Sequence, residues 1–273
     1  MKNVFTFLLL LFSLLCNGQS PKLFTTDKEL SSSLINQIYQ DRNGFIWIAT
    51  EDGLNRYDGA KFTIYKHEPN NEHSLAHNFV RTVFEDSKGH LLIGTYIGIQ
   101  MYDPATDNFT PLAKLEDTGE TLESNINSFI ERKNGEIWVS GNVLCKLDIK
   151  DHLLTVRKVD IAVTSPGSLF EDKKQNVWMA KGEEGVYQLT PDNQLTLHLS
   201  KDNGYVKSIC EDQRGNIYVG SIRKGLFIYD KERKTFVPVD LKEKGELPVC
   251  FLYSGIPNEL YIGTDGKGVV IYN

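Results

Sequence analysis

Short apolar runs separated by turns recur along the whole chain, and they follow one another in a fixed order. Each copy has an apolar run, a turn that usually begins with an acidic residue, and a second run with a large residue near its centre. The copies read INQIYQDRNGFIWIAT from residue 35, VRTVFEDSKGHLLIGT from residue 80, INSFIERKNGEIWVSG from residue 126, SLFEDKKQNVWMAK from residue 168, VKSICEDQRGNIYVGS from residue 206 and VCFLYSGIPNELYIGT from residue 249. Glycine in turn dipeptides such as Asn43-Gly44 accepts positive φ at no steric cost, so the pattern predicts antiparallel strands joined by tight turns.

The large residue of the second run marks the period of the repeat. These anchor residues are Trp47, Leu92, Trp138, Trp178, Tyr218 and Tyr261. Their spacing of about 43 residues also occurs in helical repeats, but the short β-branched and aromatic runs favour strands. Four-stranded units at this spacing are typical of propeller blades, so the sequence predicts an all-β fold, a β-propeller of about six four-stranded blades. The repeats cover approximately residues 34–65, 79–112, 125–157, 168–199, 206–239 and 249–273.

The last repeat has only three predicted strands, which raises the question of what completes it. Residues 23–26 resemble the outer strands of other blades, since Phe24-Thr25 matches Phe62-Thr63. We therefore expect this N-terminal strand to complete the sixth blade and to close the ring.

The first residues have the pattern of a secretory signal. Lys2 precedes an apolar run over residues 4–15 that is too short to span a membrane. We expect residues 1–18 to be a signal peptide cleaved after Gly18, leaving a propeller over residues 19–273. A lipid anchor on Cys16 is the alternative, disfavoured because Leu15 is large. The mature chain is then periplasmic or secreted, without membrane insertion.

The charge of the chain limits the classes of partner it can bind, and its cysteine content indicates whether disulfide bonds are expected. With 30 Lys and Arg residues against 36 Asp and Glu residues, the chain has no excess of positive charge that would favour nucleic acid or anionic lipid. The mature chain would keep three cysteines, Cys145, Cys210 and Cys250, and an odd number does not indicate a disulfide framework. Buried free thiols are favoured, while a pair between Cys210 and Cys250 stays open.

We predict no cofactor and no metal site. The Asp-x-x-Gly turns offer too few oxygen ligands for calcium, because Phe45 and Ile46 follow the first of them directly. His73 and His77 have the spacing of zinc ligands on a helix, but they lie in an Asn-rich linker where no helix is expected. The anchor tryptophans share one repeat position, which indicates packing between blades rather than sugar binding.

Two segments carry a resemblance to a known family. GFIWIATEDGLNRYDG over residues 44–59 and the linker HEPNNEHSLAHNFV over residues 67–80 resemble the two-component regulator propeller family, and the similarity extends over about residues 22–273. The resemblance implies the extracytoplasmic sensor region of hybrid two-component regulators of polysaccharide utilisation, which sense oligosaccharides. It implies a non-catalytic chain that binds an oligosaccharide or a partner protein, or that dimerises as sensors do. No kinase or DNA-binding part is recognised, so a stand-alone propeller and a fragment of a longer sensor kinase both stay open.

The ligand site is expected where loops gather at one end of the central channel. In a propeller the linkers between blades and the loops between second and third strands emerge on the same face, and residues that do not repeat there are candidates. Tyr96 and Tyr205 could stack on sugar faces, and Arg81 and Arg223 could bind hydroxyl or uronate groups. The full set of ligand-binding candidates is Arg81, Tyr96, Asn142, Tyr205, Lys207, Arg223, Asp265 and Lys267.

The alternative function is that of a propeller enzyme, either glycan-active or similar to streptogramin lyase. Such a lyase needs a base at the channel mouth, usually histidine. His90, His152 and His198 are expected in a turn or near outer strands, away from that mouth. We therefore predict no catalytic residue.

Overall fold

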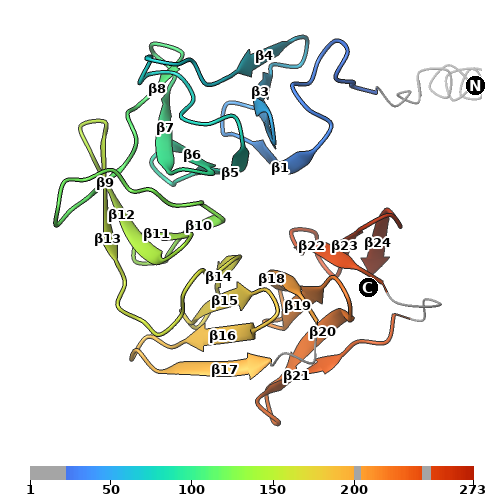
Figure 1. Cartoon of the computed structure of the whole chain (residues 1–273). Helices are drawn as coiled ribbons and strands as arrows, with labels where there is room; N and C mark the ends of the chain where they lie inside the picture. Colours follow the sequence, from blue (N-terminus) through green and yellow to red (C-terminus); the bar gives the residue numbers. More distant parts are fainter. Residues whose placement is uncertain (1–22, 200–203, 242–246) are drawn as a thin grey trace, which may run out of the picture.

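The computed structural model describes residues 23–199, 204–241 and 247–273. Within this part of the chain every regular element is a strand, and the strands form six small sheets that follow one another around an arc (Figure 1). Consecutive strands pair antiparallel in every sheet. Each sheet is one blade, and the predicted all-β propeller of six blades is confirmed.

The strand bounds follow the repeats. Blade 1 contains β1 (Ile35–Gln40), β2 (Ile46–Thr50), β3 (Gly53–Tyr57) and β4 (Phe62–Tyr65). Blade 2 contains β5 (Val80–Glu85), β6 (Leu91–Thr95), β7 (Ile99–Asp103) and β8 (Asn108–Phe109). Blade 3 contains β10 (Ser128–Glu131), β11 (Ile137–Ser140), β12 (Leu144–Lys150) and β13 (Leu153–Lys158), and β9 (Lys114–Leu115) pairs parallel with β13. Blade 4 contains β14 (Leu169–Glu171), β15 (Val177–Lys181), β16 (Gly185–Leu189) and β17 (Leu195–Leu199). Blade 5 contains β18 (Val206–Glu211), β19 (Ile217–Ser221), β20 (Gly225–Asp230) and β21 (Thr235–Pro238). Blade 6 contains β22 (Val249–Tyr253), β23 (Leu260–Thr264) and β24 (Val269–Tyr272).

The core consists of five apolar clusters, one between each pair of consecutive blades. Each cluster joins the anchor residue of one blade to alternate strand positions of the next; Trp47, for example, packs with Val83 and Ile93. We call the anchor-bearing face of a blade its forward face and the opposite face its back face. Because side chains alternate along a strand, one blade can bury apolar residues on both faces. The first five anchors are between 0% and 7% exposed.

A buried aspartate organises the turn after the first strand of the blade, which we call the inner strand. The carboxylate of Asp172 accepts backbone N–H groups of Lys174 and Asn176 at 2.8 and 2.9 Å, and the indole N–H of Trp178 at 2.8 Å. Asp41 holds Trp47 in the same way in blade 1. These aspartates are turn residues, as the sequence indicated.

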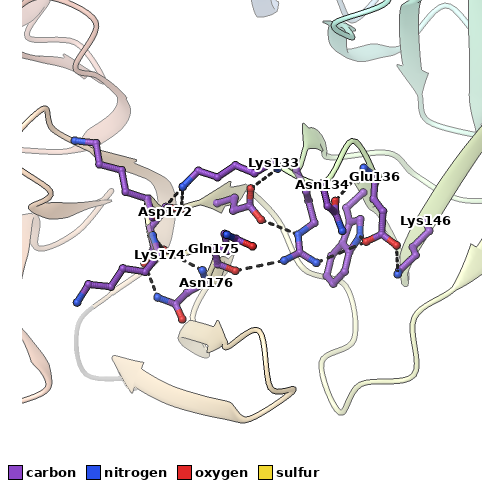
Figure 2. Close-up of polar contacts among 12 residues, drawn as sticks. Lys133, Asn134, Glu136, Lys146, Asp172, Lys174, Gln175 and Asn176 are labelled. Carbon is purple, nitrogen blue, oxygen red and sulfur yellow. Dashed lines mark hydrogen bonds and ion pairs between the residues drawn. The ribbon is translucent and has the colours of Figure 1, made fainter.

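A second carboxylate links neighbouring blades. The last residue of the inner strand is glutamate in blades 2 to 5, and it accepts a backbone N–H from the turn of the preceding blade at 2.7–3.1 Å. These inter-blade carboxylates are Glu85, Glu131, Glu171 and Glu211. Figure 2 shows the region between blades 3 and 4, where Lys133 also reaches the carbonyl of Asp172 with its ammonium group at 3.2 Å. Arg132 adds an ion pair to Glu171 at 2.9 Å.

The N-terminal segment does not complete the sixth blade, so that expectation is wrong. Phe24 packs on Tyr57 and Phe62 of blade 1, with ring centroids 5.2 and 5.0 Å apart. The N–H of Ser31 donates to the side chain of Asn55, as the linker before blade 2 does to Gln100. Residues 23–31 therefore occupy the position of an inter-blade linker on blade 1. Blade 6 keeps three strands among the described residues.

The structure also bears on the cysteines and on membrane insertion. All three described cysteines are free; Cys145 and Cys210 are buried, and Cys250 is partly buried. The open alternative of a bond between Cys210 and Cys250 is therefore not what the structure has. In the part of the chain that is described, no helix is long and apolar enough to cross a membrane. The expected signal peptide and the lipid-anchor alternative at Cys16 lie outside the described residues.

Candidate functional site

In three blades the loop after the second strand is hydrogen-bonded to a linker between blades. The N–H of Tyr96, after β6, donates to the carbonyl of Phe79 in the preceding linker at 3.0 Å. In blade 3 the carbonyl of Asn142 accepts the N–H of Ser165 at 3.0 Å. In blade 6 the N–H of Asp265 donates to Pro248 at 3.0 Å. In blades 2, 3 and 6 this loop and a linker therefore lie at the same end of the blade.

Two of the eight predicted residues line one hollow between blades 4 and 5. Tyr205 and Arg223 lie beside the loop that joins β15 to β16. The hollow has a volume of about 530 Å³. It is lined by Ser165, Lys181, Gly182, Glu183, Glu184, Gly204, Tyr205 and Arg223. Asn142 lies next to it through its hydrogen bond with Ser165.

The backbone of Gly182 allows Tyr205 to lie in this hollow. Gly182 has φ +44°, and a Cβ built on it would approach the Tyr205 ring to 3.0 Å. The carbonyl of Gly182 accepts the N–H of Val206 at 2.9 Å, which fixes the distance between the two blades at this point. A glycine here therefore lets the ring lie against the loop, with Tyr205 44% exposed.

The charged side chains of the hollow form two ion pairs. Arg223 pairs with Glu183 at 3.2 Å, and Lys181 pairs with Glu184 at 2.9 Å. Lys181 also donates to the hydroxyl of Thr164 at 3.1 Å. Two cations and two anions leave the hollow near neutrality while offering many hydrogen-bond donors and acceptors. Such a lining suits an uncharged ligand that carries many hydroxyl groups.

Two further predicted residues form a separate aromatic group on blade 2. Tyr96 is 54% exposed, and its ring centroid lies 5.6 Å from that of His77 and 6.1 Å from that of Phe79. The guanidinium of Arg81 lies 5.8 Å from the centre of the Phe79 ring. His77 accepts the N–H of Phe79 at Nδ1, at 2.9 Å, so its remaining nitrogen is Nε2.

The last three predicted residues do not line the hollow. Lys207 is exposed on β18, and Asp265 and Lys267 are exposed in the loop between β23 and β24. Sequence reasoning missed the other side chains that the two groups use, namely His77, Phe79, Ser165, Lys181, Glu183 and Glu184. All of them lie in a linker, or in or directly before a loop between second and third strands, the same class of segment that gave the other candidates, and this was the available signal.

The histidines considered for lyase chemistry lie away from this face. His90 contacts Asp86 at 2.7 Å in the turn after the inner strand of blade 2. His198 packs on Trp178 and Tyr229 at the outer edge, and burial lowers its pKa. His152 lies in the turn between β12 and β13. Among the described residues no group of three or more His, Cys, Asp or Glu side chains could hold a metal ion.

Comparisons with known proteins begin with the repeat itself. Residues 29–52, 74–96 and 200–223 match the family model of the two component regulator propeller. A segment of the chain is 37% identical over 83 residues to a protein named histidine kinase P4 from Formosa agariphila. That match covers 28% of this chain and 6% of the relative.

Solved structures share the fold at low identity. The extracellular domain of a B. thetaiotaomicron protein described as a hybrid two component system superposes with a TM-score of 0.75 at 17% identity. The superposition covers 93% of this chain and 37% of that chain. A catalytically inactive virginiamycin B lyase from Staphylococcus aureus, with quinupristin, gives a TM-score of 0.65 at 12% identity, with 93% and 87% covered. At these identities the likeness concerns the fold alone.

Proposed function

Because three of its segments match the family model of the two component regulator propeller, we propose that this chain is the ligand-sensing propeller of an extracytoplasmic signalling protein and binds an oligosaccharide. The chain spans 37% of the B. thetaiotaomicron extracellular domain and 6% of the Formosa agariphila kinase. The signal output is therefore part of the proposal, through further parts of a longer sensor or through a partner protein. Residues 1–18 would direct export.

The observation that carries the proposal is the hollow between blades 4 and 5. The exposed ring of Tyr205 offers an apolar surface to the face of a sugar ring. Around it, the paired charges of Arg223, Glu183, Lys181 and Glu184 can donate to and accept from hydroxyl groups. An aromatic platform with a few polar groups around it is the usual composition of a small-ligand site. The balanced charge favours a neutral oligosaccharide over a polyuronate.

The test is a thermal melt of the chain with a panel of plant and host oligosaccharides. A ligand at about 100 times its dissociation constant stabilises the folded state by about 2.7 kcal/mol, which corresponds to a rise in Tm of roughly 5–10 °C for this size. Tyr205→Ala should abolish the shift given by the active glycan. Tyr96→Ala, which removes another exposed tyrosine, 54% against 44% for Tyr205, from blade 2, is the matched control and should keep the shift.

Two results would contradict the proposal in different ways. If no glycan moves Tm, the ligand class is wrong and the search passes to protein partners. If a glycan moves Tm but Tyr96→Ala abolishes the shift and Tyr205→Ala does not, the site lies on blade 2.

One observation favours an enzyme as the second candidate. His77 lies beside Tyr96 on the ligand face, and because its Nδ1 accepts the N–H of Phe79, the neutral ring carries its proton on Nε2, where it can act as a general acid. Turnover of a streptogramin that is lost in His77→Ala would support this alternative. Absence of turnover at high enzyme concentration would leave the sensor as the proposed function.

A further inference from the structure

Each end of the arc has one apolar face. Elsewhere the equivalent face is covered by a neighbouring blade, but no described residues form such a cover at the two ends. Ile38 of β1 is 61% exposed. The equivalent residues on the first strands of the other five blades pair with the second strand of their own blade in the same register, and they are between 1% and 7% exposed. These counterparts are Val83, Phe129, Leu169, Ile209 and Leu252. The back face of blade 1 therefore has the composition of an interface without the blade that would bury it.

The forward face of blade 6 is open in the same way. Phe251 is 61% exposed, Ile271 is 51% exposed and Tyr253 is 50% exposed. The anchor Tyr261 pairs with Tyr253 and Ile271 and is only partly buried, whereas the five other anchors are between 0% and 7% exposed. No apolar cluster of the described residues joins blade 6 to blade 1. Figure 1 shows blade 6 and blade 1 as the two separated ends of the arc.

The polar link between blades is missing at the same place. In blades 2 to 5 the inner strand ends in a glutamate that accepts an N–H from the preceding blade. The corresponding residue of blade 1 is Gln40, whose amide donates to Gly44 of its own turn at 3.5 Å. Blade 1 thus has no carboxylate to offer the turn of blade 6. Direct packing of blade 6 on blade 1 would lack a contact that four of the five existing interfaces contain.

We propose that this opening, which we call the seam, binds a β-hairpin of a partner protein that packs between blade 6 and blade 1. The argument is continuity with the five interfaces already present, in which a forward face always meets a back face. An occupant of the seam must be a thin β-segment with apolar side chains on both faces, since both walls are apolar. A carboxylate at the end of its first strand would supply the contact that Gln40 cannot make. The seam is distinct from the hollow between blades 4 and 5.

The probe is a fluorescent synthetic peptide with the sequence of residues 80–95, VRTVFEDSKGHLLIGT. This hairpin carries a back face with Val83, a forward face with Leu92, and Glu85 at the end of its first strand. Fluorescence anisotropy with the whole chain should give saturable binding. Ile38→Glu and Ile271→Glu should each weaken binding at least tenfold, because each places a charge on one wall. Leu153→Glu, at an exposed leucine of blade 3, is the matched control and should bind as the unmodified chain does.

Three results would overturn the proposal. The peptide could fail to bind saturably at millimolar chain concentration, or bind no better than a scrambled peptide of the same composition. Binding could also be unchanged in both Ile38→Glu and Ile271→Glu, which would place the peptide elsewhere. Finally, both substitutions could lower Tm strongly while the unmodified chain ignores the peptide, which would mean that blades 1 and 6 close on each other. Circular dichroism of each variant ensures that only folded protein is compared.

Discussion

At the scale of single residues, a few buried polar groups decide the shape of each blade. Asp172 is 5% exposed and serves four donors, including both N–H groups of its own turn and the indole of Trp178. A buried donor that loses its only acceptor costs about 1–3 kcal/mol, and several lose theirs together here. The turn and the anchor are therefore held by one carboxylate.

The first prediction removes that carboxylate. Asp172→Ala should lower the free energy of unfolding by about 3 kcal/mol, because the indole N–H stays buried without an acceptor. Chemical denaturation followed by tryptophan fluorescence measures the loss. Asp117→Ala, at an exposed turn residue, is the control and should change the free energy by less than about 0.5 kcal/mol. A loss below about 1 kcal/mol for Asp172→Ala would mean that water replaces the carboxylate.

The second prediction concerns the thiols. Burial raises the pKa of Cys145 to about 11 and that of Cys210 to about 12. The thiolate is the reactive form, so both residues should resist iodoacetamide at pH 8 in the folded chain. Cys250 is only partly buried and should be alkylated first. Peptide mass spectrometry after alkylation, with and without denaturant, reads each site, and rapid labelling of Cys210 in the folded chain would contradict the burial.

At the scale of the element, charged residues hold neighbouring strands around an aromatic ring. In blade 3 the carboxylate of Glu136, just before β11, accepts from the ammonium of Lys146 on β12 and from the indole N–H of Trp138. Arg132 lies 4.5 Å from the centre of the same ring. The hydrogen bond from Lys146 lowers the pKa of Glu136 to about 2.

This arrangement predicts a specific dependence on pH. A lowered pKa in the folded state stabilises the fold above the unfolded value of 4.5, and that stability is lost as pH falls from about 5 to about 2. Because Glu136 is 33% exposed, we expect about 1 kcal/mol rather than the full shift. Glu136→Gln should cost this amount at pH 7 and almost nothing at pH 2, as measured by urea denaturation. A constant difference between the two proteins across this range would contradict the assignment.

The strands were largely predictable because their signals are local. Alternating apolar residues, turn glycines and the anchor position can all be read within one repeat, and the strands formed where those signals lie. The role of residues 23–26 could not be read in this way. Phe24-Thr25 looks like an outer strand, but its placement depends on Tyr57 and on the bond between Ser31 and Asn55, which are contacts between distant parts of the chain.

The site was predicted less completely for the same reason. The topology of a propeller indicates which loops share a face, and this led to Tyr205 and Arg223. It does not indicate which neighbours enclose a hollow, because that depends on side-chain size and on the close approach of Tyr205 to Gly182. The sequence therefore did not indicate that Glu183 pairs with Arg223.

At the scale of the whole molecule, an arc of blades is stabilised by contacts between neighbours. When each unit contacts only the next, stability is approximately the sum of the unit terms and the interface terms. Blades 2 to 5 each have two apolar interfaces, whereas blades 1 and 6 each have one. Blade 6 also has one strand fewer than the other blades in the described part of the chain.

The last prediction follows from the smaller number of interfaces that blades 1 and 6 have. Backbone amides of β22 and β23 should exchange with solvent through an opening that costs less free energy than global unfolding, while those of β11 and β15 should exchange only through global unfolding. Hydrogen exchange followed by mass spectrometry, at increasing denaturant below the transition, separates the two classes. Leu252→Ala in blade 6 should speed exchange only in blade 6, whereas Leu169→Ala at the same position of blade 4 should speed it throughout. Equal protection of all six blades would show that the two ends of the arc are held together in solution, and the seam would then be closed within one chain.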